Sequence, residues 1–377
     1  MRKRMLLIAA LFSGLLLAFC APEEPDVLRG RPTPAPVEDP RGELPELREG
    51  PAPDTKLDPQ PELPAVARDD AADTFRPAPF SEIPEGEFGG KVRAGYTIFV
   101  NSQTLRDEFV FNDQNCVNCH LNAGRNANSA PLWGAYFAYP AFRKKNNKIN
   151  SFSDRIEGCF RYSMNGKVPP EGDDALIAVS AYAYWLGMSG LMNQYGVDGP
   201  VPELTDEQLL TGGKVDDFPF PAEVAAGLAG QDVSKLPGRG YPKLAAPELD
   251  YDIDRGAEVY DRHCAVCHGS DGQGLRAEGI NSLPPLWGEG SFNHGAGMHR
   301  VNTAASFIYE NMPLGKSIQL TIQEAWDVAA YLTSHERPQD PRFEGDLAAT
   351  VKEYHHHACH YGDEIDGAAL GSQGSPP

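Results

Sequence analysis

Apolar residues recur at the three- and four-residue spacing of a buried helix face in four segments of the chain. The first segment spans residues 90–105 and the second spans residues 173–188. Their apolar positions are Val92, Tyr96 and Phe99 in the first segment, and Leu176, Val179, Ala183 and Leu186 in the second. We predict a helix over most of each segment.

The same arrangement occurs again further along the chain. Thr321 and Glu324 stand at the spacing of a capping box, and Leu320 precedes them as a candidate hydrophobic staple. The apolar positions are Ile253, Ala257 and Tyr260 in the third segment, and Ile322, Ala325, Trp326, Ala329 and Leu332 in the fourth. Pro-Leu-Trp-Gly also occurs twice, at 131–134 and 285–288. The chain therefore contains an internal duplication.

A Cys-X-X-Cys-His motif follows the first segment of each pair, at 116–120 and at 264–268. Two cysteines one helical turn apart can form thioethers to the vinyl groups of one haem, and the next histidine can bind its iron. The cysteines are Cys116, Cys119, Cys264 and Cys267, and the histidines are His120 and His268. A zinc site or a thioredoxin-like pair also uses two such cysteines, but seldom with histidine directly after them. We therefore predict two covalently bound haem c groups.

A helix before the motif and another closing the domain is the class I cytochrome c plan. We predict a mainly α fold with two such domains in tandem, over residues 86–195 and 241–345. Residues 196–240 would form a Pro/Gly-rich connecting strap. The tail over residues 346–377 would pack over the surface or be loose.

The N-terminal region has a basic start and then an apolar run that is too short for a stable membrane span. We predict an export signal over residues 1–20 and a periplasmic location. The four residues ending at Cys20 resemble a lipobox, so Cys20 is either lipidated or lies near a plain cleavage site. Residues 21–85 are rich in Pro, Glu and Asp, which predicts a disordered, Pro-rich linker.

Composition and charge restrict the partners. The 377 residues are 41% hydrophobic, with 38 Gly and 33 Pro, and the formal net charge is −20. This charge excludes a general nucleic-acid-binding protein and favours a basic electron-transfer partner. The apolar fraction suffices for two modest cores that haem would complete.

The sixth ligand of each iron remains to be assigned, because it sets the haem potential and decides whether substrate can bind. For the second haem we favour Met312, which lies in a short loop ahead of the last predicted helix, where class I cytochromes place their axial methionine. The alternatives are Met298, His294 and His299.

The corresponding position for the first haem holds Cys159, with Met164 close behind. Cys159 could bind the iron as a thiolate, a form that the neighbouring Arg155 and Arg161 would favour. Alternatively, Cys159 is a buried apolar residue or forms a disulfide with Cys359, and Met164 is the ligand.

Several sequence runs resemble the dihaem thiosulfate dehydrogenase family. They are LNAGR, PLWGAY, YPAFRKKN, DRIEGCFRYSMNG, PPLWGEGSFNHGAGMHRVNTAASFIYENMPLG and AWDVAAYLTSHERPQDPR, and the resemblance extends from about Gly89 to Phe343. It implies His/Cys ligation at the first haem, by His120 and Cys159, and His/Met ligation at the second, by His268 and Met312. It also implies that Cys159 is catalytic in joining two thiosulfates into tetrathionate, a reaction that some members favour in reverse. Some members carry Lys before the axial Met, where this chain has Asn311.

Two dianions can meet only where positive charge is concentrated. Candidate substrate contacts around Cys159 are Arg125, Arg143, Lys144, Lys145, Arg155, Arg161 and Ser163. The electrons would leave through the second haem to a small c-type cytochrome or a membrane oxidase. The alternatives are a non-catalytic dihaem electron carrier and another sulfur-oxidising cytochrome subunit, and a carrier would need neither the cysteine ligand nor a basic pocket.

Overall fold

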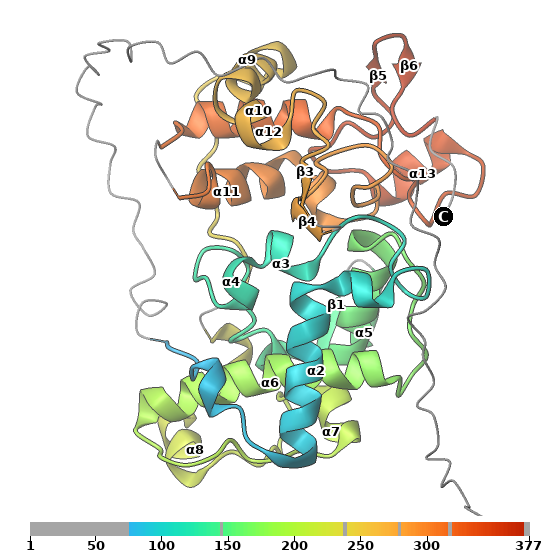
Figure 1. The fold of residues 1–377 in the computed structure, drawn as a ribbon. Coiled ribbons are helices and arrows are strands. Elements are labelled where there is room, and N and C mark those ends of the chain that lie inside the picture. The colour runs from blue at the N-terminus through green and yellow to red at the C-terminus, as the bar shows by residue number, and fades with distance from the viewer. Residues whose placement is uncertain (1–74, 144–145, 237–239, 278–279, 316–318, 373–377) are drawn as a thin grey trace, which may run out of the picture. The chain divides into compact units, whose positions relative to one another are not determined.

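A computed structural model describes residues 75–143, 146–236, 240–277, 280–315 and 319–372 (Figure 1). These residues belong to one compact unit, residues 65–377. The predicted export signal with Cys20, most of the predicted linker, Lys144 and Lys145 lie outside the described residues.

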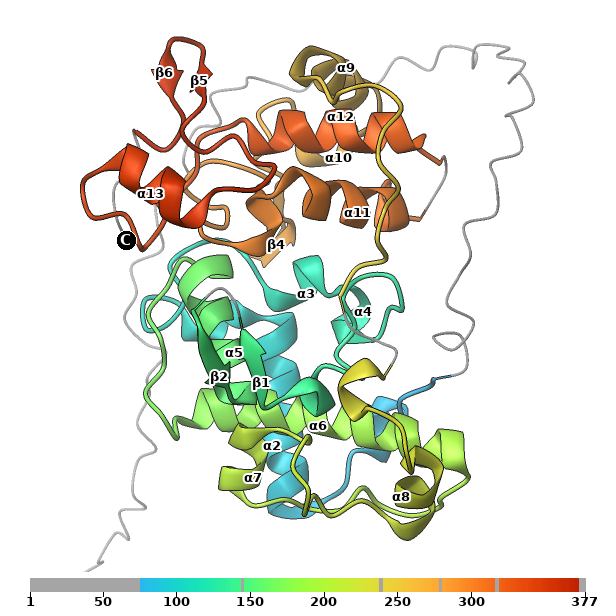
Figure 2. The same ribbon diagram turned by 180° about the vertical axis from the view of Figure 1, so that it is seen from behind.

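The described residues are mainly helical and form two lobes, each with its own hydrophobic core. In the first lobe the long helices are α2 (Gly86–Val100) and α6 (Asp174–Tyr195), and α2 crosses α6 (Figure 2). The shorter elements are η1 (Phe80–Glu82), η2 (Ser102–Leu105), α3 (Cys116–Cys119), α4 (Leu121–Gly124), η3 (Tyr136–Ala138), β1 (Ala141–Arg143), β2 (Lys148–Asn150), α5 (Phe152–Gly158), η4 (Cys159–Ser163), α7 (Asp206–Thr211), α8 (Ala222–Leu228) and η5 (Val233–Lys235).

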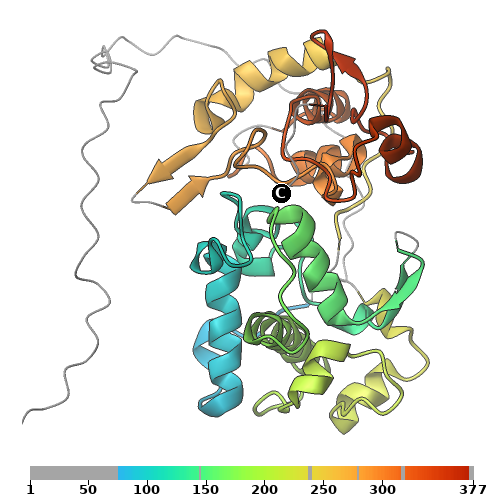
Figure 3. The ribbon, with the colours of Figure 1, turned by 90° about the vertical axis from the view of Figure 1, so that its right-hand side faces the viewer.

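The second lobe repeats this plan with shorter helices, α9 (Ile253–His263) packing across α12 (Ile322–Thr333). The other elements are α10 (Ala265–His268), β3 (Leu275–Ala277), β4 (Ile280–Leu283), η6 (Gly297–His299), α11 (Val301–Asn311), α13 (Leu347–Tyr354), β5 (Glu364–Ile365) and β6 (Ala368–Ala369). The strands form three antiparallel pairs, β1–β2, β3–β4 and β5–β6 (Figure 3). The four helices predicted from apolar periodicity are confirmed, and they are α2, α6, α9 and α12.

The predicted capping box at the start of α12 is also confirmed. The Glu324 amide donates to Thr321 Oγ1 at 3.1 Å, and the Thr321 amide donates to Glu324 Oε2 at 2.8 Å. Two otherwise unpaired donors at the helix start are thereby satisfied. Leu320, the predicted staple residue, is buried.

A glycine sits at the helix crossing in both lobes. A methyl group on Gly95 of α2 would overlap the Ala178 carbonyl of α6, and one on Gly256 of α9 would overlap the Asp327 carbonyl of α12. The backbones therefore approach more closely than any side chain would allow. This shared packing feature agrees with the duplication predicted from the sequence.

We expect Gly95→Ala to destabilise the first lobe by about 3 kcal/mol, because the helices must separate to admit the methyl group. Gly90→Ala is the matched control on the same helix, where a methyl group meets no atom of the described residues within 4 Å. The control should stabilise the protein by up to about 1 kcal/mol, because alanine has the better helix propensity. Thermal unfolding of the two variants measures the difference, and equal effects would contradict the close crossing.

The end of the predicted linker, over residues 75–85, is structured rather than disordered, and the structure also shows how the strap and the tail pack. The first core contains Phe75 from the predicted linker, and Leu209 and Val224 from the predicted strap. These segments are packed because their few apolar residues cover faces of the first lobe that α2 and α6 leave open. Of the two alternatives for the tail, residues 346–372 are packed rather than loose, with α13 and the buried Tyr361 and Leu370.

Helix α6 is long and apolar enough to cross a membrane by length and composition alone, with a mean hydropathy of 1.4. It lies in the first core, however, and every residue of the tested window is buried. A central helix of a folded domain accounts for this composition.

Side-chain amides connect the two lobes. Asn112 Nδ2 donates to the Ser291 carbonyl at 3.0 Å, and Gln114 Nε2 donates to the Pro285 carbonyl at 2.8 Å. Asn311, which precedes Met312, donates from Nδ2 to the Asn128 carbonyl at 3.0 Å. These three hydrogen bonds, two of them buried, hold the second lobe against the segments that flank the first Cys-X-X-Cys-His motif.

Candidate active site

A cavity of about 510 Å³ lies in the first lobe and reaches residues of the second. Its lining includes eight residues singled out from the sequence: Cys116, Cys119, His120, Arg143, Arg155, Cys159, Ser163 and Met164. Its volume falls in the range of pockets that enclose cofactors and small molecules. The first motif and the lone Cys159 therefore share one cavity, although they are far apart in the sequence.

His120 is oriented by its own backbone surroundings. Its Nδ1 donates to the Ala130 carbonyl at 2.5 Å, so Nε2 keeps its lone pair. Burial lowers the pKa of His120 to about 4, and the ring is therefore neutral at neutral pH. A neutral imidazole with one nitrogen held by a carbonyl has the form that binds iron.

The two cysteines of the first motif are free thiols on α3. Burial raises the pKa of Cys116 to about 11 and that of Cys119 to about 12. Paired thiols, a directed imidazole and an enclosed cavity together fit a covalently bound haem c.

Cys159 lies on a helix rather than in a loop, which corrects the expectation from the sequence. It ends α5 and begins the π-helical turn η4. Ser151 and Asp154 form a capping box at the start of α5, with the Asp154 amide donating to Ser151 Oγ at 3.1 Å. A π-helical turn is an uncommon feature that often accompanies functional sites, because it changes the direction of the side chains it carries.

Arg155 lies one helical turn before Cys159 and contacts its sulfur. Arg155 Nη1 donates to Cys159 Sγ at 2.8 Å. The pKa of Arg155 is raised above its usual value, chiefly by the charge that the Cys159 sulfur can carry, while burial acts in the opposite direction. This contact places a cationic hydrogen-bond donor directly at the Cys159 sulfur, where an anionic group would find a charged partner.

Of the other arginines that the sequence proposed as substrate contacts, one lines the cavity and two do not. Arg143 lines the cavity and donates from Nη1 to Tyr139 Oη at 3.0 Å. Among the described residues, Arg125 and Arg161 do not belong to the lining. Arg125 donates from Nη2 to the Pro77 carbonyl at 2.7 Å, and Arg161 is exposed, with its backbone carbonyl accepting from Asn293 at 2.9 Å.

The cavity also contains residues that sequence reasoning did not single out. Tyr241 comes from the start of the second predicted domain, and Phe292 comes from within that domain. Met298, which the sequence offered only as an alternative ligand of the second haem, also lines this cavity. Burial raises the pKa of Tyr241 well above its usual value, so its hydroxyl stays protonated. No motif marks these positions, because their role depends on how the two lobes meet.

The alternative disulfide between Cys159 and Cys359 is wrong, because both cysteines are free thiols. Met164, the alternative ligand for the first haem, is buried in the first core and also lines the cavity.

The second Cys-X-X-Cys-His motif starts at Cys264, the residue before α10, and ends with α10 at His268. Cys264 is half-buried and Cys267 is exposed. Burial lowers the pKa of His268 and raises that of Cys264 to about 11. Met312 follows α11 and packs against the second core.

The residues that the sequence offered as alternative ligands for the second haem have other surroundings in the structure. His294 packs edge-on against Tyr361 with ring centroids 4.9 Å apart, and its Nε2 lies 3.7 Å from a Glu336 carboxylate oxygen. His299 Nε2 lies 2.9 Å from His357 Nε2, and Met298 lines the first cavity.

Comparisons with known proteins agree with these features. A family model described as "Cytochrome c" matches residues 253–336, which span α9 to α12. The fold and its motifs thus define a c-type cytochrome. The chain is 45% identical over 300 residues to a thiosulfate dehydrogenase of Stutzerimonas stutzeri, covering 79% of this chain and 85% of that protein. It therefore belongs to the thiosulfate dehydrogenase family.

Two further comparisons support this membership. A thiosulfate dehydrogenase of Thiomonas intermedia is 42% identical over 303 residues, covering 80% of this chain and 84% of that protein. A solved thiosulfate dehydrogenase (TsdBA) from Marichromatium purpuratum superposes with a TM-score of 0.66 at 41% identity. That match covers 82% of this chain and 59% of the solved chain.

Proposed function

We propose that this chain is an exported dihaem enzyme that oxidises two thiosulfate ions to one tetrathionate ion. The observation that carries the proposal is the cavity shared by His120 and Cys159, in which a guanidinium contacts the Cys159 sulfur. A simple electron carrier needs no such thiolate. The names of the relatives support thiosulfate as the substrate.

We infer that both lobes are class I cytochrome c domains and that each holds one haem c. Cys116, Cys119 and His120 would hold the first haem, with Cys159 as the sixth ligand. The second set would be Cys264, Cys267, His268 and Met312. Each haem supplies a one-electron acceptor, so the pair accommodates the two electrons that leave when two thiosulfates couple.

The chain's own residues supply the sulfur chemistry. The Cys159 thiolate forms a bond to the outer sulfur of thiosulfate as two electrons depart, which leaves a cysteine S-thiosulfonate. The outer sulfur of a second thiosulfate then attacks this group, releases tetrathionate and restores the Cys159 thiolate. This second step is a thiol–disulfide exchange.

Arg155 and Arg143 supply positive charge for two anionic substrates in an acidic protein. The Arg155 guanidinium already lies at the sulfur where they react, and it can hold a sulfonate by two parallel hydrogen bonds. Ser163, on the cavity wall, offers a further donor. Arg125, Arg161 and Lys145, candidates from the sequence, have no assigned contact in this mechanism.

Electrons would pass from the first haem to the second and then to a small c-type cytochrome or a membrane oxidase. Phe292 and Met298 of the second lobe line the first cavity, so residues of the lobe proposed to accept the electrons lie beside the proposed reaction site. We further propose a periplasmic location, with Cys20 either lipidated or near a plain cleavage site. Both steps run backwards, with two electrons supplied by a reduced electron donor, would make the enzyme a tetrathionate reductase.

Product analysis tests the proposed function. Full-length holoprotein supplied with thiosulfate and ferricyanide should form one tetrathionate for every two ferricyanides reduced, because coupling releases two electrons. Chromatography of the anions and the ferricyanide absorbance measure the two quantities. Sulfate or sulfite as the main product would contradict the proposal, as would the absence of thiosulfate-dependent reduction.

A further inference from the structure

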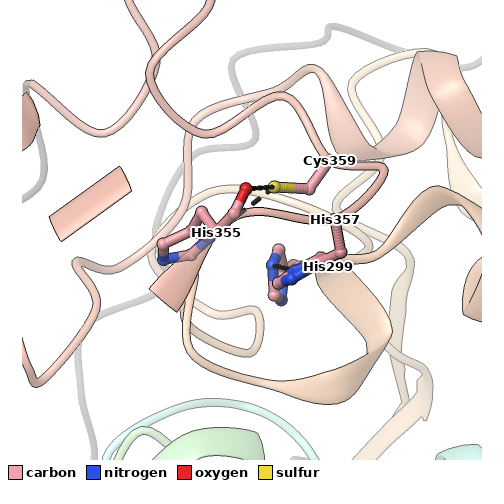
Figure 4. Close-up of side chains that lie close together, drawn as sticks. All are labelled: His299, His355, His357 and Cys359. Atoms are coloured by element: carbon pink, nitrogen blue, oxygen red, sulfur yellow. Dashed lines mark hydrogen bonds between the residues drawn. The ribbon is translucent and has the colours of Figure 1, made fainter. Parts of the chain in front are cut away.

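Three histidines and a cysteine converge in the second lobe, and none of them belongs to a Cys-X-X-Cys-His motif. They are His299, His355, His357 and Cys359 (Figure 4). One ligand atom from each residue lies within 4.8 Å of those from the other three. His299 and His355 are buried, and His357 and Cys359 are half-buried. The proposed reaction uses none of the four.

The nearest atoms already approach the spacing of ligands around one ion. Cys359 Sγ lies 3.6 Å from His355 Nδ1, and His357 Nε2 lies 2.9 Å from His299 Nε2. In a tetrahedral zinc site, bonds of about 2.3 Å to sulfur and about 2.0 Å to nitrogen place sulfur and nitrogen about 3.5 Å apart and two nitrogens about 3.3 Å apart. Shifts of about 1 Å or less would bring all four atoms to this geometry.

The hydrogen bonds of two rings direct their remaining nitrogens into the cluster. His299 Nδ1 donates to the Ala296 carbonyl, so its Nε2 keeps a lone pair. His355 Nε2 lies 2.9 Å from Asp340 Oδ2 and donates to it, which leaves Nδ1 for a ligand. A carbonyl or carboxylate behind the imidazole is the usual support of a metal-bound histidine, because it fixes the tautomer and orients the ring.

We propose that His299, His355, His357 and Cys359 bind one Zn²⁺ ion. Three imidazoles and a thiolate match the ligand preference of this borderline-soft cation. Four protein ligands close the coordination shell, which is typical of a structural site rather than a catalytic one.

The site joins two parts of the chain that are distant in sequence. His299 stands in η6, directly before α11, whereas the other three ligands follow α13 in the tail. The Val301 amide also donates to the Ala358 carbonyl at 3.0 Å, which lays the tail along the start of α11. The ion would therefore fasten the tail to the helix that leads to Met312, the proposed ligand of the second haem.

Metal analysis of the full-length holoprotein, produced without an affinity tag, tests this proposal. Zinc and iron measured in the same sample should give one zinc for every two irons, because iron counts the haems. X-ray absorption at the zinc edge should show one sulfur at about 2.3 Å and three nitrogens at about 2.0 Å. Cys359→Ser and His357→Ala should each lower the zinc content at least about tenfold while iron stays unchanged.

His356→Ala is the matched control, because His356 is an exposed neighbour outside the cluster, and it should retain its zinc. An unchanged iron content and haem spectrum show that each variant is folded. Wild-type protein without zinc, copper in its place, or equal zinc in the Cys359 variant and the wild type would each overturn the proposal. Loss of zinc with unaltered turnover would support it and would leave the proposed function untouched.

Discussion

Replacing Cys159 with alanine should lower thiosulfate-dependent ferricyanide reduction by at least about 10³-fold, because the proposed sulfur transfer begins on this residue. Alanine is preferable to glycine here, since Cys159 lies in a helical turn where glycine would add about 1 kcal/mol of destabilisation. Steady-state assays measure the loss, and iron content with the haem spectrum shows whether both haems remain attached. Electron paramagnetic resonance should show a low-spin thiolate signal in the oxidised wild type and none in the variant.

Met164→Leu is the informative control, because Met164 lines the same cavity and is the alternative ligand. The variant keeps the volume of the side chain but removes the thioether sulfur. It should retain turnover within about twofold and keep the thiolate signal, since such swaps cost little in a packed core. Unchanged turnover in Cys159→Ala, or loss of the low-spin signal only in Met164→Leu, would contradict the assignment of Cys159.

The sequence predicted the features of this molecule that depend on interactions between residues close together in the chain. The apolar periodicities around Val92 and Leu176 correspond to helices α2 and α6. Thr321 and Glu324 form the capping box of α12. Helix formation and capping need only neighbours three or four residues away. The two Cys-X-X-Cys-His motifs are local in the same sense.

The features that the sequence did not predict depend on contacts between distant segments. The sequence groups Arg125 with the candidate substrate-binding cations around Cys159, yet Arg125 contacts Pro77 and Phe80 instead. The strap packs into the first core because Leu209 and Val224 meet a surface made by other elements. Isolated apolar residues show no helical or strand periodicity, so the sequence alone does not predict that they are buried.

Cys159 and His299 illustrate the same limit in the sites. The sequence singles out Cys159 as a candidate ligand, and the residue does line the cavity. Its place on a helix does not follow from the sequence, because a π-helical turn has no recognised sequence pattern. The three tail ligands lie within five residues, but the fourth is more than fifty residues upstream. Only the fold brings His299 to them.

Replacing Arg155 with glutamine should lower kcat/KM for thiosulfate by about 10- to 150-fold, the equivalent of a charged hydrogen bond of about 1.5–3 kcal/mol. Arg155 is the described cation that contacts the Cys159 sulfur, and it reaches the cavity where two anionic substrates must meet. Glutamine can still donate a hydrogen bond but carries no charge, so the loss reports on electrostatics. Steady-state kinetics at low ionic strength measures it, because salt would screen the remaining cations.

Arg155→Lys and Arg161→Gln complete the experiment. Lysine retains the charge but not the two-point geometry of guanidinium, so that variant should fall between the wild type and Arg155→Gln. Arg161 is exposed and outside the cavity lining, and its glutamine variant should stay within about twofold of the wild type. If the Arg161 variant lost as much activity as the Arg155 variant, the substrate would be held by the general positive charge of α5 and η4. A loss confined to Arg155 would instead place the requirement at the guanidinium that contacts the reacting sulfur.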